Sequence, residues 1–116
     1  MSLSRADFTL EPATIQLKDG RSIKLRRLSA YERMDYIGAC GESGKANADK
    51  TQRERLNAAT ALAGDLVALC LLGDDGQPIF ASGDEAARGM DPDIFDEVGE
   101  AAAKLNRIGS GNDPNA

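Results

Sequence analysis

The sequence predicts an α+β fold that is mostly helical: an N-terminal β-hairpin followed by three to four helices around one long central helix. Three observations indicate it. Two runs of alternating apolar residues flank a glycine turn, the longest apolar run, Leu56–Leu72, has helical periodicity, and Asp91-Pro92 marks a further helix start. A chain of 116 residues suffices for one domain. We place this domain at residues 1–108 and expect 109–116 to be a disordered polar tail.

The hairpin is predicted from the runs Ala13–Leu17 and Arg21–Arg26. A two-residue Asp19-Gly20 loop would place the apolar residues of the two strands on opposite faces. A three-residue loop with Gly20 in the left-handed conformation instead pairs Ile15 with Ile23 and Ala13 with Leu25 on one face. We therefore expect the second register. Residues 1–12 form a lead-in arm that could add an edge strand.

The first helix is expected to begin at Ala30, because Ser29 and Glu32 match a capping box. Two glycines within Gly38–Gly41 predict that it stops there, and the following residues form a polar loop.

The central helix is predicted to begin near Asp49 and to end at Gly73. Its apolar stripe lies on one face and comprises Leu56, Ala59, Ala63, Leu66, Val67 and Cys70. The segment Val67–Leu72 is apolar all round, so it must be covered on more than one side, by other elements or by another chain. Asn57, Gly64 and Asp65 make the run a poor membrane span.

Three further elements follow. Gln77–Phe80 is expected to be a short extended piece, and Ser82 or Asp84 can cap a short helix over Glu85–Arg88. Asp91-Pro92 then begins a helix that continues to about Leu105–Arg107. The predicted inner face of this last helix is Ile94, Phe95, Val98, Ala101, Ala102 and Leu105.

The net charge of −5 is unevenly distributed. Residues 1–55 carry 11 Lys/Arg against 8 Asp/Glu, whereas residues 56–116 carry 3 against 11. An acidic chain with few aromatic residues is a weak candidate for binding nucleic acid. The basic strand Arg21–Arg27 is better explained as a sheet edge protected against pairing. Cys40 and Cys70 show no CxxC spacing, which favours two free thiols in a reducing cytoplasm.

The chemistry of the chain does not favour an enzyme. It has no histidine, the commonest general base and a usual zinc ligand. The carboxylates between Asp91 and Glu100 lack the order of a calcium loop and are expected to be a solvated helix face. Gly38, Gly41 and Gly44 precede no phosphate-loop lysine. We therefore expect no catalytic residues, cofactor or metal.

The order of the elements resembles a known family, the tail assembly chaperones of long-tailed, siphovirus-like bacteriophages and prophages. The resemblance covers about residues 10–107. It rests on a hairpin running into Arg26-Arg27-Leu28-Ser29 and Glu32, a long helix ending in an apolar run, the segment Gly76–Phe80, and a last helix closing in Leu105-Asn106.

The resemblance implies a non-enzymatic protein of the bacterial host cytoplasm that binds the tape-measure protein, keeps it soluble and leaves the finished tail. The tail tube protein is a second candidate partner, and self-association remains open. The candidate contact residues are Leu62, Leu69, Leu72, Ile79 and Phe80. The alternative for each is that it only completes the core. For the whole chain the alternative function is a small dimerising adaptor or regulator of a host process.

Overall fold

The computed structural model describes residues 2–108, so the tail expected at 109–116 lies outside the described residues. In chain order the elements are a 3₁₀-helix η1 (Arg5–Phe8), strands β1 (Ala13–Gln16) and β2 (Ser22–Leu25), helices α1 (Ala30–Ala46) and α2 (Gln52–Cys70), strand β3 (Leu71–Leu72), and helices α3 (Gly83–Gly89) and α4 (Pro92–Leu105). The predicted fold class is confirmed.

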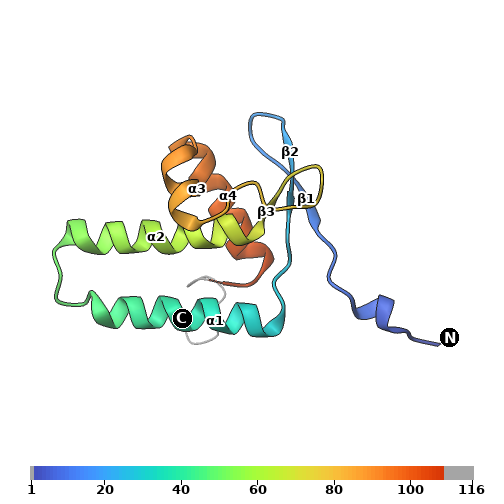
Figure 1. Ribbon diagram of the computed structural model, residues 1–116, viewed down its shortest axis with the longest axis horizontal. Helices are drawn as coiled ribbons and strands as arrows, with labels where there is room; N and C mark the ends of the chain where they lie inside the picture. The colour runs from blue at the N-terminus through green and yellow to red at the C-terminus, as the bar shows by residue number, and fades with distance from the viewer. Residues whose placement is uncertain (1, 109–116) are drawn as a thin grey trace.

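Helix α2 is the central element. Helices α3 and α4 pack against it, and α1 runs antiparallel beside it, as Figure 1 shows. The small sheet lies at the end of α2, and the N-terminal arm extends away from the body. The arm contains η1 and pairs with no strand, so the edge strand considered for residues 1–12 is absent from the described residues.

The hairpin has the expected register. Ile15 lies opposite Ile23 and Ala13 opposite Leu25, and Gly20 has a φ of +96°. The loop is closed by the amide of Leu17, which donates to the carbonyl of Arg21 at 2.7 Å. The alternation of apolar residues therefore selected the turn, because only this register puts the apolar residues of both strands on one face.

The prediction that the central helix continues to Gly73 was wrong. It ends at Cys70, and Leu71 and Leu72 form β3, which pairs with Leu25 and Lys24 of β2. A strand points successive side chains to opposite faces, and both leucines are buried in this way. The segment that had to be covered on several sides is thus largely covered within the chain.

The interpretation of Arg21–Arg27 as a protected sheet edge was also wrong. The strand order is β1-β2-β3, so β2 is the middle strand. Lys24, the basic residue within β2, lies opposite Thr14 of β1 on one side and Leu72 of β3 on the other.

Helix α1 continues through its glycines to Ala46, so the stop expected at Gly38–Gly41 was wrong. The Ser29–Glu32 capping box is present and fixes the start of the helix. Half-buried positions then recur every three or four residues and define one face: Arg33, Tyr36, Cys40, Ser43 and Asn47. Tyr36, on this face, donates from its hydroxyl to the carbonyl of Leu62 on α2 at 2.6 Å. Tertiary contact therefore outweighs a propensity cost of about 1 kcal/mol per glycine.

Helices α3 and α4 begin with capping residues that the sequence predicted. Ser82 caps α3, and the Asp91 carboxylate accepts from the amides of Asp93 and Ile94 at 2.9 and 3.1 Å. Helix α4 buries Phe95, Val98 and Ala102 of its predicted face. The start of α2 differs, because Thr51 caps it rather than Asp49.

The core lies where α2, α4 and the sheet meet. Its largest fully buried side chains are Leu25, Val67, Cys70 and Val98. Only the C-terminal half of the predicted α2 stripe belongs to it, because Leu56 is 59% exposed and Ala59 is also exposed. The first half of α2 and most of α1 thus form a helical hairpin outside the core, against which Tyr36 of α1 packs.

Helix α3 approaches α2 at a pair of glycines. A Cβ placed on Gly64 would overlap the carbonyl oxygen of Gly83, and one placed on Gly83 would lie 2.5 Å from the amide nitrogen of Asp65. The start of α3 can therefore lie directly on α2 only because both residues lack a side chain.

We expect Gly20→Ala to lower the free energy of unfolding by about 1 kcal/mol, because a Cβ is strained at this φ. The matched control is Gly38→Ala, an exposed site in α1 with open space around it, which should be neutral or stabilising by up to about 1 kcal/mol. Urea denaturation measures both, and equal losses would contradict the assigned turn.

Gly64→Ala should cost about 1–3 kcal/mol, because a backbone carbonyl rather than a flexible side chain occupies the space of the new methyl group. Thermal unfolding checks it against the same Gly38→Ala control. An unchanged melting temperature would show that α3 does not sit on α2 in this way.

Candidate functional site

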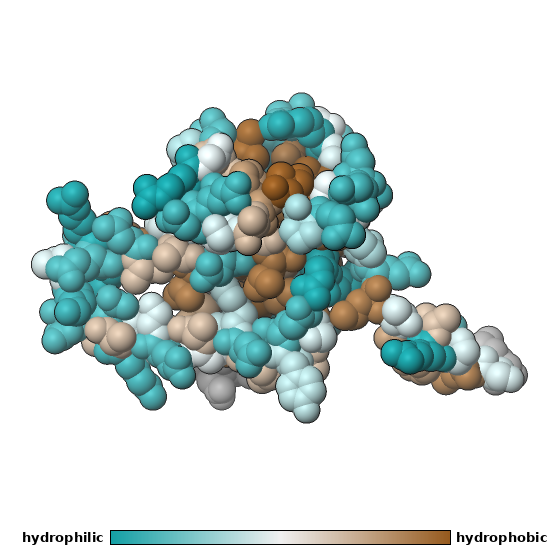
Figure 2. Space-filling view, viewed as in Figure 1, coloured by the Kyte–Doolittle hydropathy of each residue, from teal (hydrophilic) through white to brown (hydrophobic). Residues whose placement is uncertain are grey.

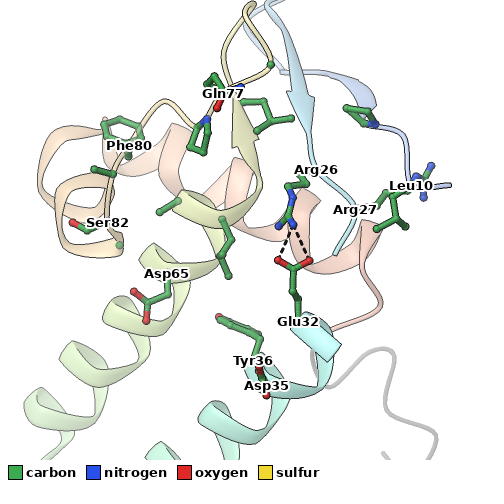
Figure 3. Close-up of a pocket in the computed structure, with 18 of the residues that line it drawn as sticks. Leu10, Arg26, Arg27, Glu32, Asp35, Tyr36, Asp65, Gln77, Phe80 and Ser82 are labelled. Carbon is green, nitrogen blue, oxygen red and sulfur yellow. Dashed lines mark hydrogen bonds and ion pairs between the residues drawn. The ribbon is translucent and has the colours of Figure 1, made fainter. Parts of the chain in front are cut away.

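An open groove of about 1120 Å³ lies on the described part of the chain. Its walls come from the first half of α1, the second half of α2, the loop between β3 and α3, and the N-terminal arm (Figure 3). Apolar side chains predominate: Leu10, Pro12, Tyr36, Ala68, Leu69, Leu72, Pro78, Phe80 and Ala81. Figure 2 shows apolar surface in the middle of this face, with polar surface around it.

Leu69 is the exposed part of the apolar floor. It lines the groove from α2 and is 39% exposed, whereas Leu72, which also lines the groove, is 7% exposed. Leucine is a side chain whose complete burial yields about 1.5–3 kcal/mol. A ligand that covers Leu69 can gain part of that energy.

Phe80 is held at the groove by the turn after β3. Gly76 has a φ of +80°, and the amide of Gly73 donates to the carbonyl of Gln77 at 2.8 Å. The amide of Ile79 then donates to the carbonyl of Leu71 at 3.2 Å, which ties the segment back to the sheet. These backbone hydrogen bonds fix the position of the segment that contains the half-buried Phe80.

An ion pair joins the end of β2 to the first turn of α1. The Arg26 guanidinium donates to both carboxylate oxygens of Glu32 at 2.8 and 2.7 Å, as the dashed lines of Figure 3 show. Glu32 also accepts from the Ser29 amide at 2.9 Å. That backbone hydrogen bond, and after it the bond from Arg26, lower the pKa of Glu32 below its ordinary value. The pair therefore stays ionised at neutral pH and positions α1 relative to the sheet.

Tyr36 joins the two helices at the base of the groove. Burial raises the pKa of its hydroxyl strongly, so the hydroxyl stays protonated and keeps donating to the carbonyl of Leu62.

Burial likewise raises the pKa of the Cys70 thiol to about 11. Both cysteines are free, and Cys70 is fully buried, so the expectation of free thiols is confirmed.

The structure separates the five predicted contact residues. Leu69, Leu72 and Phe80 line the groove, whereas Leu62 and Ile79 do not. Leu72 was predicted to be a contact residue, with completion of the core as the alternative; it lies in β3, which pairs with β2, and it is buried, so it offers little exposed surface. Leu62 is half-buried beside α1, and Ile79 is 53% exposed outside the groove.

Sequence reasoning missed much of the polar lining of the groove, including the charged side chains of Arg26, Asp35 and Asp65 and the hydroxyl of Tyr36. These residues come from three segments that only the fold brings together. The capping box did identify Glu32 as fixed in place, but nothing in the sequence indicated that Arg26 would reach it.

The carboxylates of α4 do not form a cluster with a ligand-binding arrangement. Asp91, Asp93, Asp96 and Glu100 are exposed, and the Glu97 carboxylate accepts from the Lys18 amide at 2.9 Å. Within residues 2–108, no group of three or more Cys, Asp or Glu side chains is placed to hold a metal ion. No helix of that same region is both long and apolar enough to cross a membrane.

Comparison of the chain with protein-family models, curated proteins and solved structures gave no significant match.

We expect Glu32→Gln to lower the free energy of unfolding at pH 7 by about 0.5–1 kcal/mol, because glutamine can still cap the helix but cannot pair with Arg26. The pKa of Glu32 is lowered by folding, so its contribution is present above the unfolded pKa and is lost as pH falls through the folded one. Urea denaturation of both proteins between pH 7 and pH 2 checks this. A difference that stays constant over the whole range would contradict the ion pair.

Proposed function

We propose that this chain is a non-enzymatic tail assembly chaperone of a long-tailed bacteriophage or prophage, which binds the tape-measure protein and promotes assembly of the tail tube around it. The observation that supports the proposal most directly is the open groove with an apolar floor between α1 and α2. The order of elements over residues 10–107 supplies the resemblance to the family.

The groove has the volume of a short segment of helix. With a helix diameter of about 10–12 Å and a pitch of 5.4 Å, its volume corresponds to about two turns of helix. Helix-in-groove recognition places an amphipathic helix with its apolar face in such a cleft. A long helical client would present many such faces, each of which aggregates when left uncovered.

The proposed activity is transient shielding rather than permanent assembly. A groove that takes two turns buries far less than the roughly 1,600 Å² of a standard stable complex, which suits a helper that leaves the product. On this proposal the protein acts in the host cytoplasm, is absent from the mature virion, and recruits tail tube subunits to the covered client.

Co-expression with the tape-measure protein encoded in the same genome should move that protein from the pellet to the soluble fraction, because covering apolar helix faces suppresses their self-association. Leu69→Asp should abolish the rescue, since it places a charge on the floor of the groove. Because Leu69 is 39% exposed, the variant should retain its circular dichroism spectrum.

The matched control is Leu56→Asp. It makes the same change on the same helix, at a leucine that is 59% exposed and outside the groove. It should leave the rescue intact. Loss of rescue in both variants would move the binding surface away from the groove. A wild-type protein that neither solubilises nor pulls down the tape-measure protein would overturn the chaperone proposal in favour of the adaptor.

A further inference from the structure

The charges around the groove are unequal. Its lining contains the acidic residues Glu11, Glu32, Asp35 and Asp65 and the basic residues Arg26 and Arg27. The bidentate pair between Arg26 and Glu32 cancels one charge of each sign. Three carboxylates and one guanidinium then remain, and among residues 2–108 none of these four has an ionic partner.

The carboxylates lie on different elements that surround the apolar floor. Asp35 comes from α1, Asp65 from α2 and Glu11 from the N-terminal arm, and Figure 3 shows the two aspartates on the two helices. Both aspartates are exposed. An occupant that lies on Leu69 therefore has an acidic side chain on each helical wall.

We propose that the groove selects a basic amphipathic helix, with an apolar stripe on Leu69 and Phe80 and Lys or Arg side chains beside the stripe that face Asp35 and Asp65. This inference rests on the proposed helix-binding function and names the chemistry of the bound segment. The charge complementarity supplies the selection, because apolar contact with the floor is the same for an acidic and a basic helix of equal hydrophobicity.

The physical size of the selection is modest. Exposed ion pairs are worth about 0.2–1 kcal/mol each, so two of them change affinity by about two- to thirtyfold. The effect should be screened by salt, since the Debye length falls from about 14 Å near 0.05 M to about 4 Å near 0.5 M. The overall negative charge of the chain adds to the attraction at low salt.

The test uses two labelled peptides of about 18 residues, roughly five helical turns. They share one leucine stripe at i, i+3, i+4 and i+7 spacing, with lysines beside it in one peptide and glutamates in the other. Fluorescence anisotropy with the full chain should show the lysine peptide binding at least about tenfold more tightly than the glutamate peptide at low salt. The preference should shrink as salt rises.

Asp35→Asn combined with Asp65→Asn should weaken binding of the lysine peptide about two- to thirtyfold and reduce its salt dependence. The matched control is Asp96→Asn combined with Glu100→Gln, which removes two exposed carboxylates from α4, a helix that contributes nothing to the groove. The control should bind like the wild type. If both double variants lost the same affinity for the lysine peptide, the preference would come from the net charge of the chain rather than from Asp35 and Asp65. That result would overturn the inference.

Leu69→Asp separates this inference from the proposed function. If both peptides bind equally and Leu69→Asp abolishes both, the groove binds helices without regard to charge, and only the present inference falls. Tighter binding of the glutamate peptide, or binding of neither, also overturns it, while rescue of the tape-measure protein tests the chaperone proposal independently.

Discussion

The side chain of Asn106 connects the three parts of the chain on which the rest of the structure depends. It is 6% exposed, and its Oδ1 accepts from the Leu28 amide at 2.7 Å. Its Nδ2 lies 3.0 Å from the Ala102 carbonyl, 3.4 Å from the Arg26 carbonyl and 3.6 Å from the Cys70 sulfur. The end of α4 is thereby fastened to the segment between β2 and α1 and to the end of α2. A buried Leu28 amide without this partner would cost about 1–3 kcal/mol.

The position of Asn106 is itself fixed by the way α4 ends. Arg107 takes a left-handed φ of +56°, and the Ile108 amide donates back to the Ala103 carbonyl at 2.7 Å, which is the closing bond of a Schellman motif. Ile108 is buried as the apolar residue that accompanies this motif. The end of α4 is therefore a structured cap that holds the amide of Asn106 against the exit of β2.

The groove follows from this arrangement. Fastening the residues after β2 sets where Arg26 and Glu32 meet, and their ion pair sets where α1 begins. The close approach of Gly64 to Gly83 places the loop after β3 on the other side of α2. Helix α1 buries none of its residues completely, so nothing from the core fills the space between these two walls. The groove stays open because most of the apolar residues that pack on α2 lie in the core, on the opposite side of this helix.

The sequence by itself determined the local elements. Alternation and Gly20 selected the hairpin register, and the side chains of Ser29, Ser82 and Asp91 selected helix starts, because each of these features acts through neighbours within four residues. Tertiary structure decided the end of α2, where pairing with β2 outweighed helical periodicity, and the length of α1, where contact with α2 outweighed three glycines. Tertiary structure also decided the candidate site. The sequence alone identified Leu69 as a candidate contact residue. The burial of Leu72 and the convergence of Arg26, Asp35 and Asp65 depend instead on segments that lie about 10 to 50 residues apart. Contacts across such separations leave no periodicity in the sequence, since they arise only when the chain closes on itself.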